Sequence, residues 1–332
     1  MRDCRLAERA GYMYMNIVFL EANTLGDDVD LGMFEKLGTV KTYPLSDPEK
    51  NAERCMDADV VVLNKIPVNA SLLDGNDRTT LVCITATGTN IVDFPYVNGR
   101  GIAIANVKGY STESVVQHTF ALAFFLWERM HYYDTFVKSG DYARSDVFSH
   151  FTEKFHELAG HTWGIIGLGT IGKRVAEIAK CFGCKVIYYS TSGKHDEPGF
   201  ERVSLDTMMR EADVISVHAP LNDATKGLVG ARELSLMKKS AIILNLGRGG
   251  IIDEAALADA IEAGTIAGAG TDVLTKEPIA ADNPLMRIKD SGKLVITPHI
   301  AWASVEARIR CAEEVYLNIE AWMKGEERNI CR

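Results

Sequence analysis

Two groups of residues in this 332-residue sequence have types and spacing suited to chemistry. The first is the G-x-G-x-x-G run at Gly167, Gly169 and Gly172, which follows an apolar strand-like segment and opens a helix-like one. In that setting the first glycine permits a tight turn, the second lets the backbone approach a pyrophosphate, and the third lets the helix pack closely on the strand. The N–H groups of the helix N-terminus then hold the phosphates. The run therefore predicts a dinucleotide-binding site.

The second group comprises Arg248, Glu277 and His299, each of which lies just past the carboxyl end of a predicted strand. Ligands of a doubly wound parallel sheet bind beyond the carboxyl ends of its strands. We therefore expect an arginine, a carboxylate and an imidazole at the ligand-binding edge of one sheet.

The strand after the glycine run ends in hydroxyl side chains, at Ser190, Thr191 and Ser192, with Lys194 close behind. An acid at this point would bind the ribose hydroxyl of NAD, whereas an arginine would favour the 2′-phosphate of NADP. No carboxylate appears before Asp196 and no arginine follows directly. NAD(H) and NADP(H) are therefore both open.

The seven cysteines are odd in number and dispersed, which is typical of reduced intracellular thiols. Cys181 and Cys184 have the CxxC spacing of redox and zinc sites. They follow a helix-like run, and a helix C-terminus disfavours a thiolate. No second cysteine pair completes a zinc site. A structural role is favoured, and no metal site is expected.

The composition is that of a globular protein, with 36 Lys and Arg against 45 Asp and Glu and a net charge of −9. This acidic balance argues against nucleic acid or an anionic membrane as a partner, since both need clustered positive charge. We find no signal peptide and no apolar run long enough to span a membrane. A cytoplasmic protein is expected, with the role of residues 1–14 open.

Strand-like and helix-like segments alternate along the chain, which predicts an α/β fold with parallel sheets. The first series of strands is expected at 16–20, 39–42, 60–63, 81–85 and 102–105, and a second series of six at 162–166, 185–189, 214–218, 241–246, 267–273 and 294–297. One long helix is expected from Ser111 to Lys138. A last helix is expected from Ser304 to Lys324.

In its motifs the chain resembles the D-isomer-specific 2-hydroxyacid dehydrogenase family, from about Asn16 to Gly325. The matching pieces are Gly88 within 86–93, the glycine run, His218-Ala219-Pro220 through Thr225, the Arg248 turn, Asp272 with Glu277-Pro278, and Pro298-His299. Within the family, Asn64-Lys65 and the segment 299–308 are similar to glycerate dehydrogenases, also called hydroxypyruvate reductases. Gly247 departs from the alanine or serine often found there, and we expect it to loosen the turn slightly.

The resemblance implies two Rossmann-like doubly wound domains. Residues 1–107 and 300–332 would form a discontinuous substrate domain, with an NAD(P)-binding domain, 108–299, inserted between its parts. It also implies a homodimer through the Ser111–Lys138 helix region.

The resemblance and elementary chemistry together assign roles to the catalytic residues. His299 would be the general acid, because imidazole titrates nearest to neutral pH. Glu277 would orient its ring, and Arg248 would bind the substrate carboxylate with two parallel hydrogen bonds and polarise the carbonyl.

The remaining site residues are expected to bind rather than react. The N–H groups of Thr87, Gly88 and Thr89 would hold the carboxylate of a small anionic 2-keto or 2-hydroxy acid. Lys65 would either add a second cation or be solvated, and Trp302 would border the substrate or merely pack. The expected dinucleotide contacts are Thr112, Gly167, Gly169, Thr170, Ile171, Gly172, Ser190, Thr191, Ser192, Lys194, His218, Ala219, Pro220, Thr225, Leu246, Gly247 and Asp272.

The leading prediction is thus an NAD(P)-dependent oxidoreductase for a small 2-keto acid, with hydroxypyruvate and D-glycerate favoured. Other D-2-hydroxyacid specificities, such as D-lactate, glyoxylate or an aromatic 2-keto acid, stay open. A dinucleotide-sensing protein like the corepressors of this fold is the alternative of another class, and the complete set of Arg248, Glu277 and His299 argues against it.

Overall fold

The structure, a computed structural model, describes residues 14–194 and 196–332. The chain forms two compact units. One comprises the described residues up to Ser111 together with Ala303–Arg332, and the other is Thr112–Trp302. The second unit is therefore an insertion within the first, and its limits fall a few residues after the expected ones.

The first unit is built on a sheet in the order β13-β5-β4-β3-β1-β2. Its parallel strands are β1 Met15–Phe19, β2 Gly38–Thr42, β3 Val60–Leu63, β4 Leu81–Ile84 and β5 Ala103–Ala105, and β13 Ile330–Cys331 pairs antiparallel with β5. Strands β3 and β4 are continuous apolar runs, buried at every residue, as expected of strands covered on both faces. The β13 strand was not expected, because two half-buried residues give no periodic signal.

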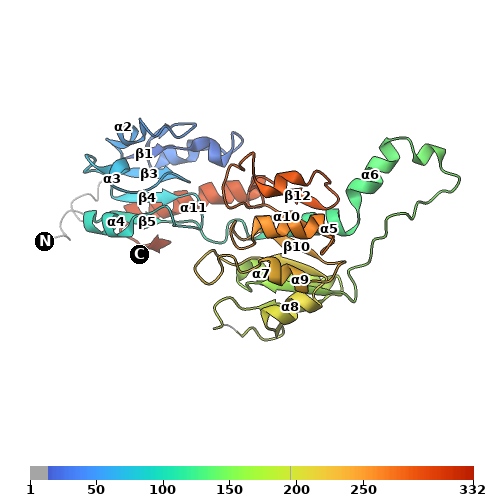
Figure 1. The fold of residues 1–332 in the computed structure, drawn as a ribbon. Helices are drawn as coiled ribbons and strands as arrows, with labels where there is room; N and C mark the ends of the chain where they lie inside the picture. Colours follow the sequence, from blue (N-terminus) through green and yellow to red (C-terminus); the bar gives the residue numbers. More distant parts are fainter. Residues whose placement is uncertain (1–13, 195) are drawn as a thin grey trace. The chain divides into compact units, whose positions relative to one another are not determined.

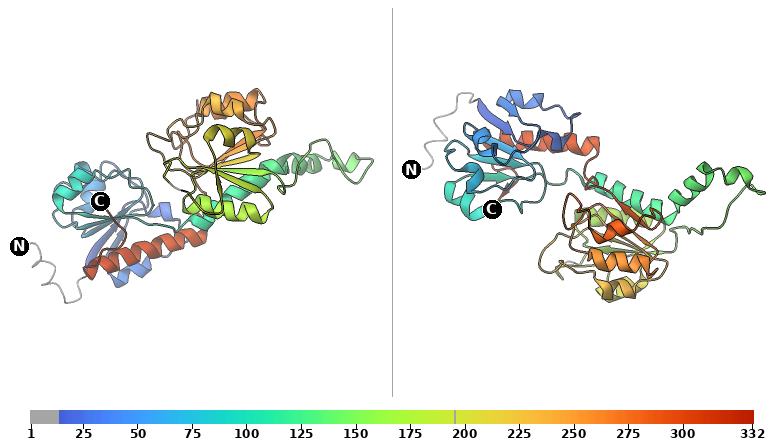
Figure 2. Two further views of the ribbon diagram at one scale, coloured as in Figure 1. Left: turned by 90° about the horizontal axis from the view of Figure 1, so that it is seen from below. Right: turned by 45° about the horizontal axis from the view of Figure 1, so that its top comes forward.

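Helices and 3-10 turns cover this sheet, as Figures 1 and 2 show. The α-helices are α2 Asn51–Cys55, α3 Ala70–Leu73, α4 Phe94–Arg100 and α11 Val305–Met323, and the 3-10 helices are η1 Ala22–Leu25 and η2 Gly32–Lys36. The last helix begins as expected, because the Ser304 side chain accepts a hydrogen bond from the Ala307 N–H.

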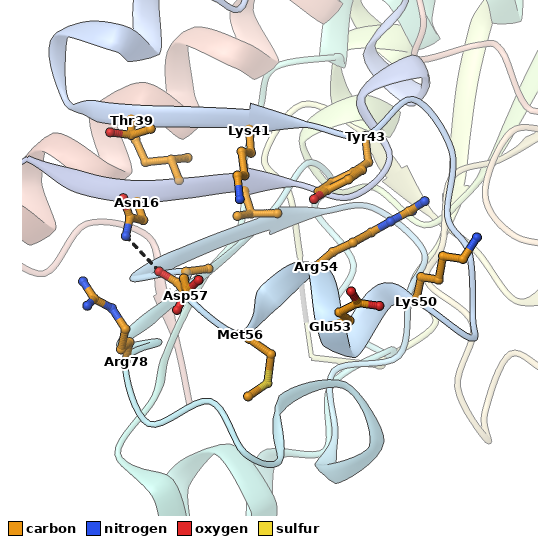
Figure 3. A pocket seen from close by; sticks show the side chains of 13 residues that line it. Asn16, Thr39, Lys41, Tyr43, Lys50, Glu53, Arg54, Met56, Asp57 and Arg78 are labelled. Atoms are coloured by element: carbon orange, nitrogen blue, oxygen red, sulfur yellow. Dashed lines mark hydrogen bonds between the residues drawn. The ribbon is translucent and has the colours of Figure 1, made fainter.

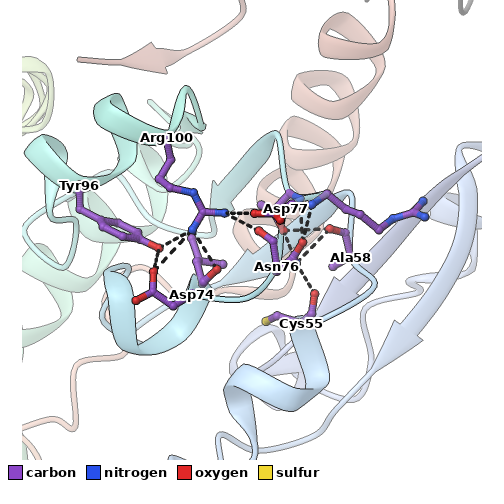
Figure 4. Close-up of polar contacts among 10 residues, drawn as sticks. Cys55, Ala58, Asp74, Asn76, Asp77, Tyr96 and Arg100 are labelled. Carbon is purple, nitrogen blue, oxygen red and sulfur yellow. Dashed lines mark hydrogen bonds and ion pairs between the residues drawn. The ribbon is translucent and has the colours of Figure 1, made fainter.

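A buried polar network fixes the loop after α3 (Figure 4). Asn76 is 1 % exposed, and its side-chain amide donates to the Ala58 carbonyl and the Thr79 hydroxyl. The Arg100 guanidinium donates to the Asn76 carbonyl at 2.6 Å and to the Tyr96 hydroxyl at 2.8 Å. These partly buried bonds tie α4 to the loop between α3 and β4.

The second unit contains a seven-stranded parallel sheet in the order β12-β11-β10-β9-β6-β7-β8. Its strands are β6 Thr162–Ile166, β7 Lys185–Tyr189, β8 Glu201–Arg202, β9 Val214–Val217, β10 Ile242–Asn245, β11 Gly268–Thr271 and β12 Leu294–Ile296. The expectation of six strands was one short, because β8 has two exposed charged residues and no apolar pattern. The chain order reverses beside β6, as in dinucleotide-binding folds.

Helices cover both faces of this sheet (Figure 2), and a hydrophobic cluster lies on each face. One face carries α5 Thr112–Trp127 and α7 Thr170–Cys181, and the other carries α8 Leu205–Glu211, α9 Ala231–Leu236 and α10 Glu254–Glu262, with η4 Pro284–Arg287 beside α10. Helices on both faces of parallel strands make this a doubly wound sheet, as expected.

The single helix expected over Ser111–Lys138 is wrong. The structure has two helices there, α5 and α6 Met130–Lys138, and the short η3 Tyr142–Arg144 follows. Arg129 between them has φ of 55°, a left-handed conformation that ends a right-handed helix. The pattern missed the break because the apolar residues of α5 encircle it and mask any change of period.

Within the described residues, no helix combines the length and apolar character needed to cross a membrane.

Candidate active site

His299 and Glu277 form a hydrogen-bonded pair in the second unit. The ring Nδ1 of His299 lies 2.7 Å from Oε2 of Glu277, and both side chains are partly exposed. The other oxygen, Oε1, accepts the Leu274 N–H at 2.9 Å. The carboxylate is thus held at both oxygens. Among the described residues no hydrogen bond engages His299 Nε2, so that nitrogen is left to meet a ligand.

The loop that carries His299 is anchored to Asp272, which is 2 % exposed. One oxygen of Asp272 accepts the Thr297 hydroxyl at 2.6 Å and the Ile300 N–H at 2.9 Å, and the other accepts the Ala301 N–H at 2.8 Å. The His299 N–H donates to the Asp272 carbonyl at 2.8 Å. The position of the imidazole therefore depends on a buried carboxylate one strand away.

Helix α5 supports the same loop from a second side. His118 Nε2 lies 3.0 Å from the Thr297 hydroxyl, and the Ser114 hydroxyl donates to the Ala301 carbonyl at 2.6 Å. The contribution of α5 could not be read from the sequence, because these residues are separated from the loop by about 180 positions.

Arg248 follows β10 on a tight turn. The Asn245 side chain closes this turn by donating to the Arg248 carbonyl at 3.0 Å and accepting the Gly247 N–H at 3.1 Å. A Cβ on Gly249 would lie 2.0 Å from the Leu274 carbonyl, so only glycine fits there. The Arg248 turn therefore packs directly against the segment that leads to Glu277.

Arg248 has no carboxylate partner within 4.0 Å in the part of the chain that the structure describes, and its side chain is exposed. One Nη donates to the Gly247 carbonyl at 2.8 Å. Strands β10, β11 and β12 are neighbours with parallel register, so Arg248, Glu277 and His299 lie past the same edge. An unpaired guanidinium and an oriented imidazole suit an anionic substrate that gains or loses a proton.

The glycine run has the geometry of a phosphate cradle. Gly167 has φ of 92°, and a Cβ on Gly172 would lie 2.2 Å from the Gly167 carbonyl. A Cβ on Gly169, by contrast, would meet no atom within 4 Å, and no side chain caps α7 there. A hollow of about 480 Å³ opens at this point, lined partly by Thr112, Thr170 and Lys173. The site fits a dinucleotide pyrophosphate.

The segment after β9 lies against this cradle. His218 is half-buried, yet both of its ring nitrogens are buried without a partner. Burial lowers the pKa of this imidazole to about 3. Ala219 packs against Gly167, whereas the Thr225 hydroxyl is fully buried and donates to the Pro220 carbonyl at 2.7 Å. Thr225 therefore shapes the loop rather than facing open space.

Gly247, which we expected to loosen its turn slightly, lies directly against a neighbouring loop. A Cβ at this position would lie 2.7 Å from the Ala219 carbonyl, so the glycine permits close packing of two loops. The neighbouring Leu246 is 7 % exposed and belongs to the apolar core. Ile171 and Trp302 also pack partly against that core.

The turn after β7 has a cation that sequence reasoning missed. Ser190 is buried, while Thr191, Ser192 and Lys194 are more exposed. Arg202 on β8 donates to the Gly193 carbonyl at 3.0 Å and pairs with Asp196 at 3.1 Å. No arginine follows the turn directly in the sequence, but a short parallel strand brings Arg202 back to it. His195 lies outside the described residues.

The predicted residues of the first unit lie at the carboxyl edge of its own sheet. Lys65 is exposed just past β3, and the turn of Thr87, Gly88 and Thr89 follows the neighbouring β4. The Thr87 hydroxyl donates to the Val107 carbonyl at 2.8 Å, and the Thr89 carbonyl accepts the Val92 N–H. A side-chain hydroxyl and a backbone carbonyl therefore hold the turn in place.

A larger hollow of about 810 Å³ lies beside β1, β2 and α2 (Figure 3), and none of the predicted site residues lines it.

Cys181 is exposed and Cys184 is buried, and burial raises the pKa of the Cys184 thiol to about 11. Among the described residues no three His, Cys, Asp or Glu side chains group as a metal site would require.

Comparison with known proteins identifies the class. Residues 120–301 match the family model described as "D-isomer specific 2-hydroxyacid dehydrogenase, NAD binding domain". The chain is 36% identical over 319 residues to glycerate dehydrogenase of Methylorubrum extorquens, covering 96% of this chain and 99% of that one. It is 35% identical to hydroxypyruvate reductase of Blautia hydrogenotrophica, covering 95% and 99%. The crystal structure of the TT0316 protein from Thermus thermophilus superposes with a TM-score of 0.83 at 28% identity, covering 96% and 100%.

The chain belongs to the D-isomer-specific 2-hydroxyacid dehydrogenase family. It is an oxidoreductase that interconverts the CH–OH group of a small hydroxy acid and the carbonyl group of the keto acid, with NAD(H) or NADP(H). The expected fold, enzyme class and choice of dinucleotide cofactors are confirmed.

Proposed function

We propose that the substrate pair is hydroxypyruvate and D-glycerate. The observation that carries this proposal is the oriented His299–Glu277 pair on the same sheet edge as the unpaired Arg248. The names of the two full-length relatives, glycerate dehydrogenase and hydroxypyruvate reductase, support the choice within the class.

The catalytic roles follow from this geometry. The nicotinamide supplies or accepts the hydride when the dinucleotide is bound. His299 gives a proton from Nε2 to the ketone oxygen during reduction, because Nδ1 is engaged by Glu277. The Glu277 carboxylate stabilises the positive ring, and Arg248 binds the substrate carboxylate and polarises its carbonyl. The reverse reaction uses the neutral ring as the base.

Two groups of the first unit are also proposed to bind the substrate carboxylate. Lys65 supplies a second cation, and the N–H groups of Thr87, Gly88 and Thr89 donate to the substrate carboxylate. Exposure of Lys65 and the fixed turn after β4 support these roles.

We further propose that the enzyme uses NADP(H) at least as well as NAD(H). Lys194 and Arg202, the latter paired with Asp196, place two cations at the turn after β7, and three hydroxyl residues add hydrogen-bond donors. Such a set suits an adenosine 2′-phosphate better than a site with an acid on the ribose. The remaining proposed contacts of the dinucleotide are those at Gly169, Thr170 and His218.

We also propose a homodimer. The arm formed by α6 and residues 139–157 extends from the second unit in Figure 1. Large apolar side chains on this arm are exposed. Phe148 is 91% exposed, Phe151 79% and Val147 62%. Apolar patches of this kind mark protein contacts, and a second copy of the chain would bury them.

Steady-state kinetics test the proposed substrate. We expect the highest kcat/KM for hydroxypyruvate among hydroxypyruvate, glyoxylate, pyruvate and phenylpyruvate, each assayed with NADH and with NADPH. A higher kcat/KM for any other acid of this panel would replace hydroxypyruvate as the substrate while leaving the enzyme class intact.

A further inference from the structure

Glu21 stands at the point where the strand order of the first unit reverses. It follows β1 closely, and β1 lies between β2 and β3 in the sheet. In open α/β sheets, ligands bind outside the carboxyl ends of the strands at such a reversal. Glu21 is therefore placed beside a potential ligand crevice of its own unit.

The carboxylate of Glu21 gathers three consecutive backbone donors. Its Oε2 accepts the N–H groups of Asn64 at 2.9 Å, Lys65 at 2.8 Å and Ile66 at 3.3 Å. Successive N–H groups that converge on one point form a nest that binds an anion. Here the anion is a side chain of the same unit, and hydrogen bonds to a charged acceptor are strong ones.

This contact fixes the loop without neutralising its cation. Asn64 and Ile66 are each 7% exposed, whereas the Lys65 side chain between them is exposed. In the part of the chain that the structure describes, Lys65 has no carboxylate within 4.0 Å of its ammonium group. Glu21 thus binds the backbone of Lys65 and leaves the ammonium group available.

We propose that Glu21 is a positioning residue that holds the Lys65 loop in the conformation that binds the substrate carboxylate. The inference rests on the proposed role of Lys65 in substrate binding. Glu21 acts only through this loop and does not itself touch the substrate. Without it, three N–H groups lose their shared acceptor, and the loop is free to move the Lys65 side chain away.

The experiment compares Glu21→Ala, Glu21→Gln and Lys65→Ala by steady-state kinetics with hydroxypyruvate. A loss of about one charged hydrogen bond predicts a KM for hydroxypyruvate at least about tenfold higher in Glu21→Ala, with kcat and the KM for NADPH little changed. Glu21→Gln keeps an acceptor oxygen and should recover part of the loss. Glu53→Ala, an exposed glutamate of α2, is the matched control and should behave as the wild type.

Acetate separates positioning from a loss of fold. It should fill the vacated nest and lower the KM for hydroxypyruvate in Glu21→Ala, whereas in the wild type it should only compete with the substrate. A Glu21→Ala enzyme with wild-type KM, or one that acetate never improves, would overturn the inference. If Glu21→Ala and Lys65→Ala both have a wild-type KM, it is the proposed role of Lys65 in substrate binding that fails. If only Lys65→Ala raises KM, the role of Lys65 stands and that of Glu21 is refuted.

Discussion

At the scale of single residues, the molecule separates the imidazole that we propose to react from the groups that hold it. His299 is oriented by Glu277 through its ring and by Asp272 through its backbone. The sequence was sufficient to predict His299, Glu277 and Arg248 as a set, because each follows a strand and has a distinctive neighbour. It could not reveal His118 or Arg202, because those contacts depend on how distant elements are folded together.

Glu277→Gln should lower kcat and leave the KM for hydroxypyruvate less changed. A neutral amide cannot stabilise a positive imidazole. Glutamine has one acceptor oxygen where glutamate has two, so either the Leu274 N–H or the His299 ring loses its acceptor. A charged hydrogen bond is worth about 1.5–3 kcal/mol, which corresponds to a decrease of about 10- to 100-fold in kcat. Glu262→Gln, on the exposed side of α10, is the control. Equal kcat in both variants would refute the role of Glu277.

His218 should make the protein less stable in acid. Its pKa is about 3 in the folded state and about 6.5 when unfolded, so between these values only the unfolded chain is protonated. The free energy of unfolding should therefore fall by about 1.4 kcal/mol per pH unit below pH 6.5 from this residue alone. Urea denaturation of the wild type and His218→Gln at pH 7.5, 6.0 and 5.0 measures it. A difference between the two proteins that is independent of pH would contradict the assignment.

At the scale of elements, short turns determine where the functional side chains at the ends of strands and helices lie. Every expected strand is present, and the clearest signals come from the buried apolar runs such as β3, β4 and β10. The elements that were missed are those without such a signal, namely β8, β13 and the break at Arg129. In the glycine run, two glycines have different roles. Gly172 allows α7 to pack against the Gly167 carbonyl, whereas no atom lies near the position of a Cβ on Gly169.

Gly169→Ala and Gly172→Ala should separate the effect of a glycine on dinucleotide affinity from its effect on stability. The first adds a methyl group in open space, so stability should change by less than about 0.5 kcal/mol while the affinity for NADPH falls at least about tenfold. The second drives a methyl group against the Gly167 carbonyl and should cost about 1–3 kcal/mol of stability. Thermal unfolding and dinucleotide fluorescence titration measure both effects. Equal affinity in Gly169→Ala and the wild type would argue against phosphate binding there.

At the scale of the whole molecule, one compact unit is inserted into another, and their sheets have different strand orders. The sequence had no compositional mark at either boundary, and only the family resemblance suggested the insertion. The net charge of −9 provided no hint of chemistry, because the cations that we propose to bind substrate and cofactor are a few residues near strand ends.

The double variant Phe148→Ser, Phe151→Ser should shift the protein from dimer to monomer. Both rings are largely exposed on the arm, and a second copy would have to cover them. Sedimentation velocity at micromolar concentration reports the change. Leu45→Ser removes an exposed apolar residue of the other unit and should leave the dimer intact. A wild-type protein that sediments as a monomer would remove the basis of this prediction.

We expect the site formed by Arg248, Glu277 and His299 at the sheet edge to catalyse the reduction of 2-keto acids, with His299 as the general acid. The most direct test measures NADPH oxidation by the wild type and His299→Ala with hydroxypyruvate, together with NADPH affinity by fluorescence. General acid catalysis predicts a kcat lower by about 10²- to 10⁴-fold in His299→Ala with unchanged NADPH binding. A His299→Ala enzyme that retains wild-type kcat would contradict the role of this histidine and of the sheet edge that holds it.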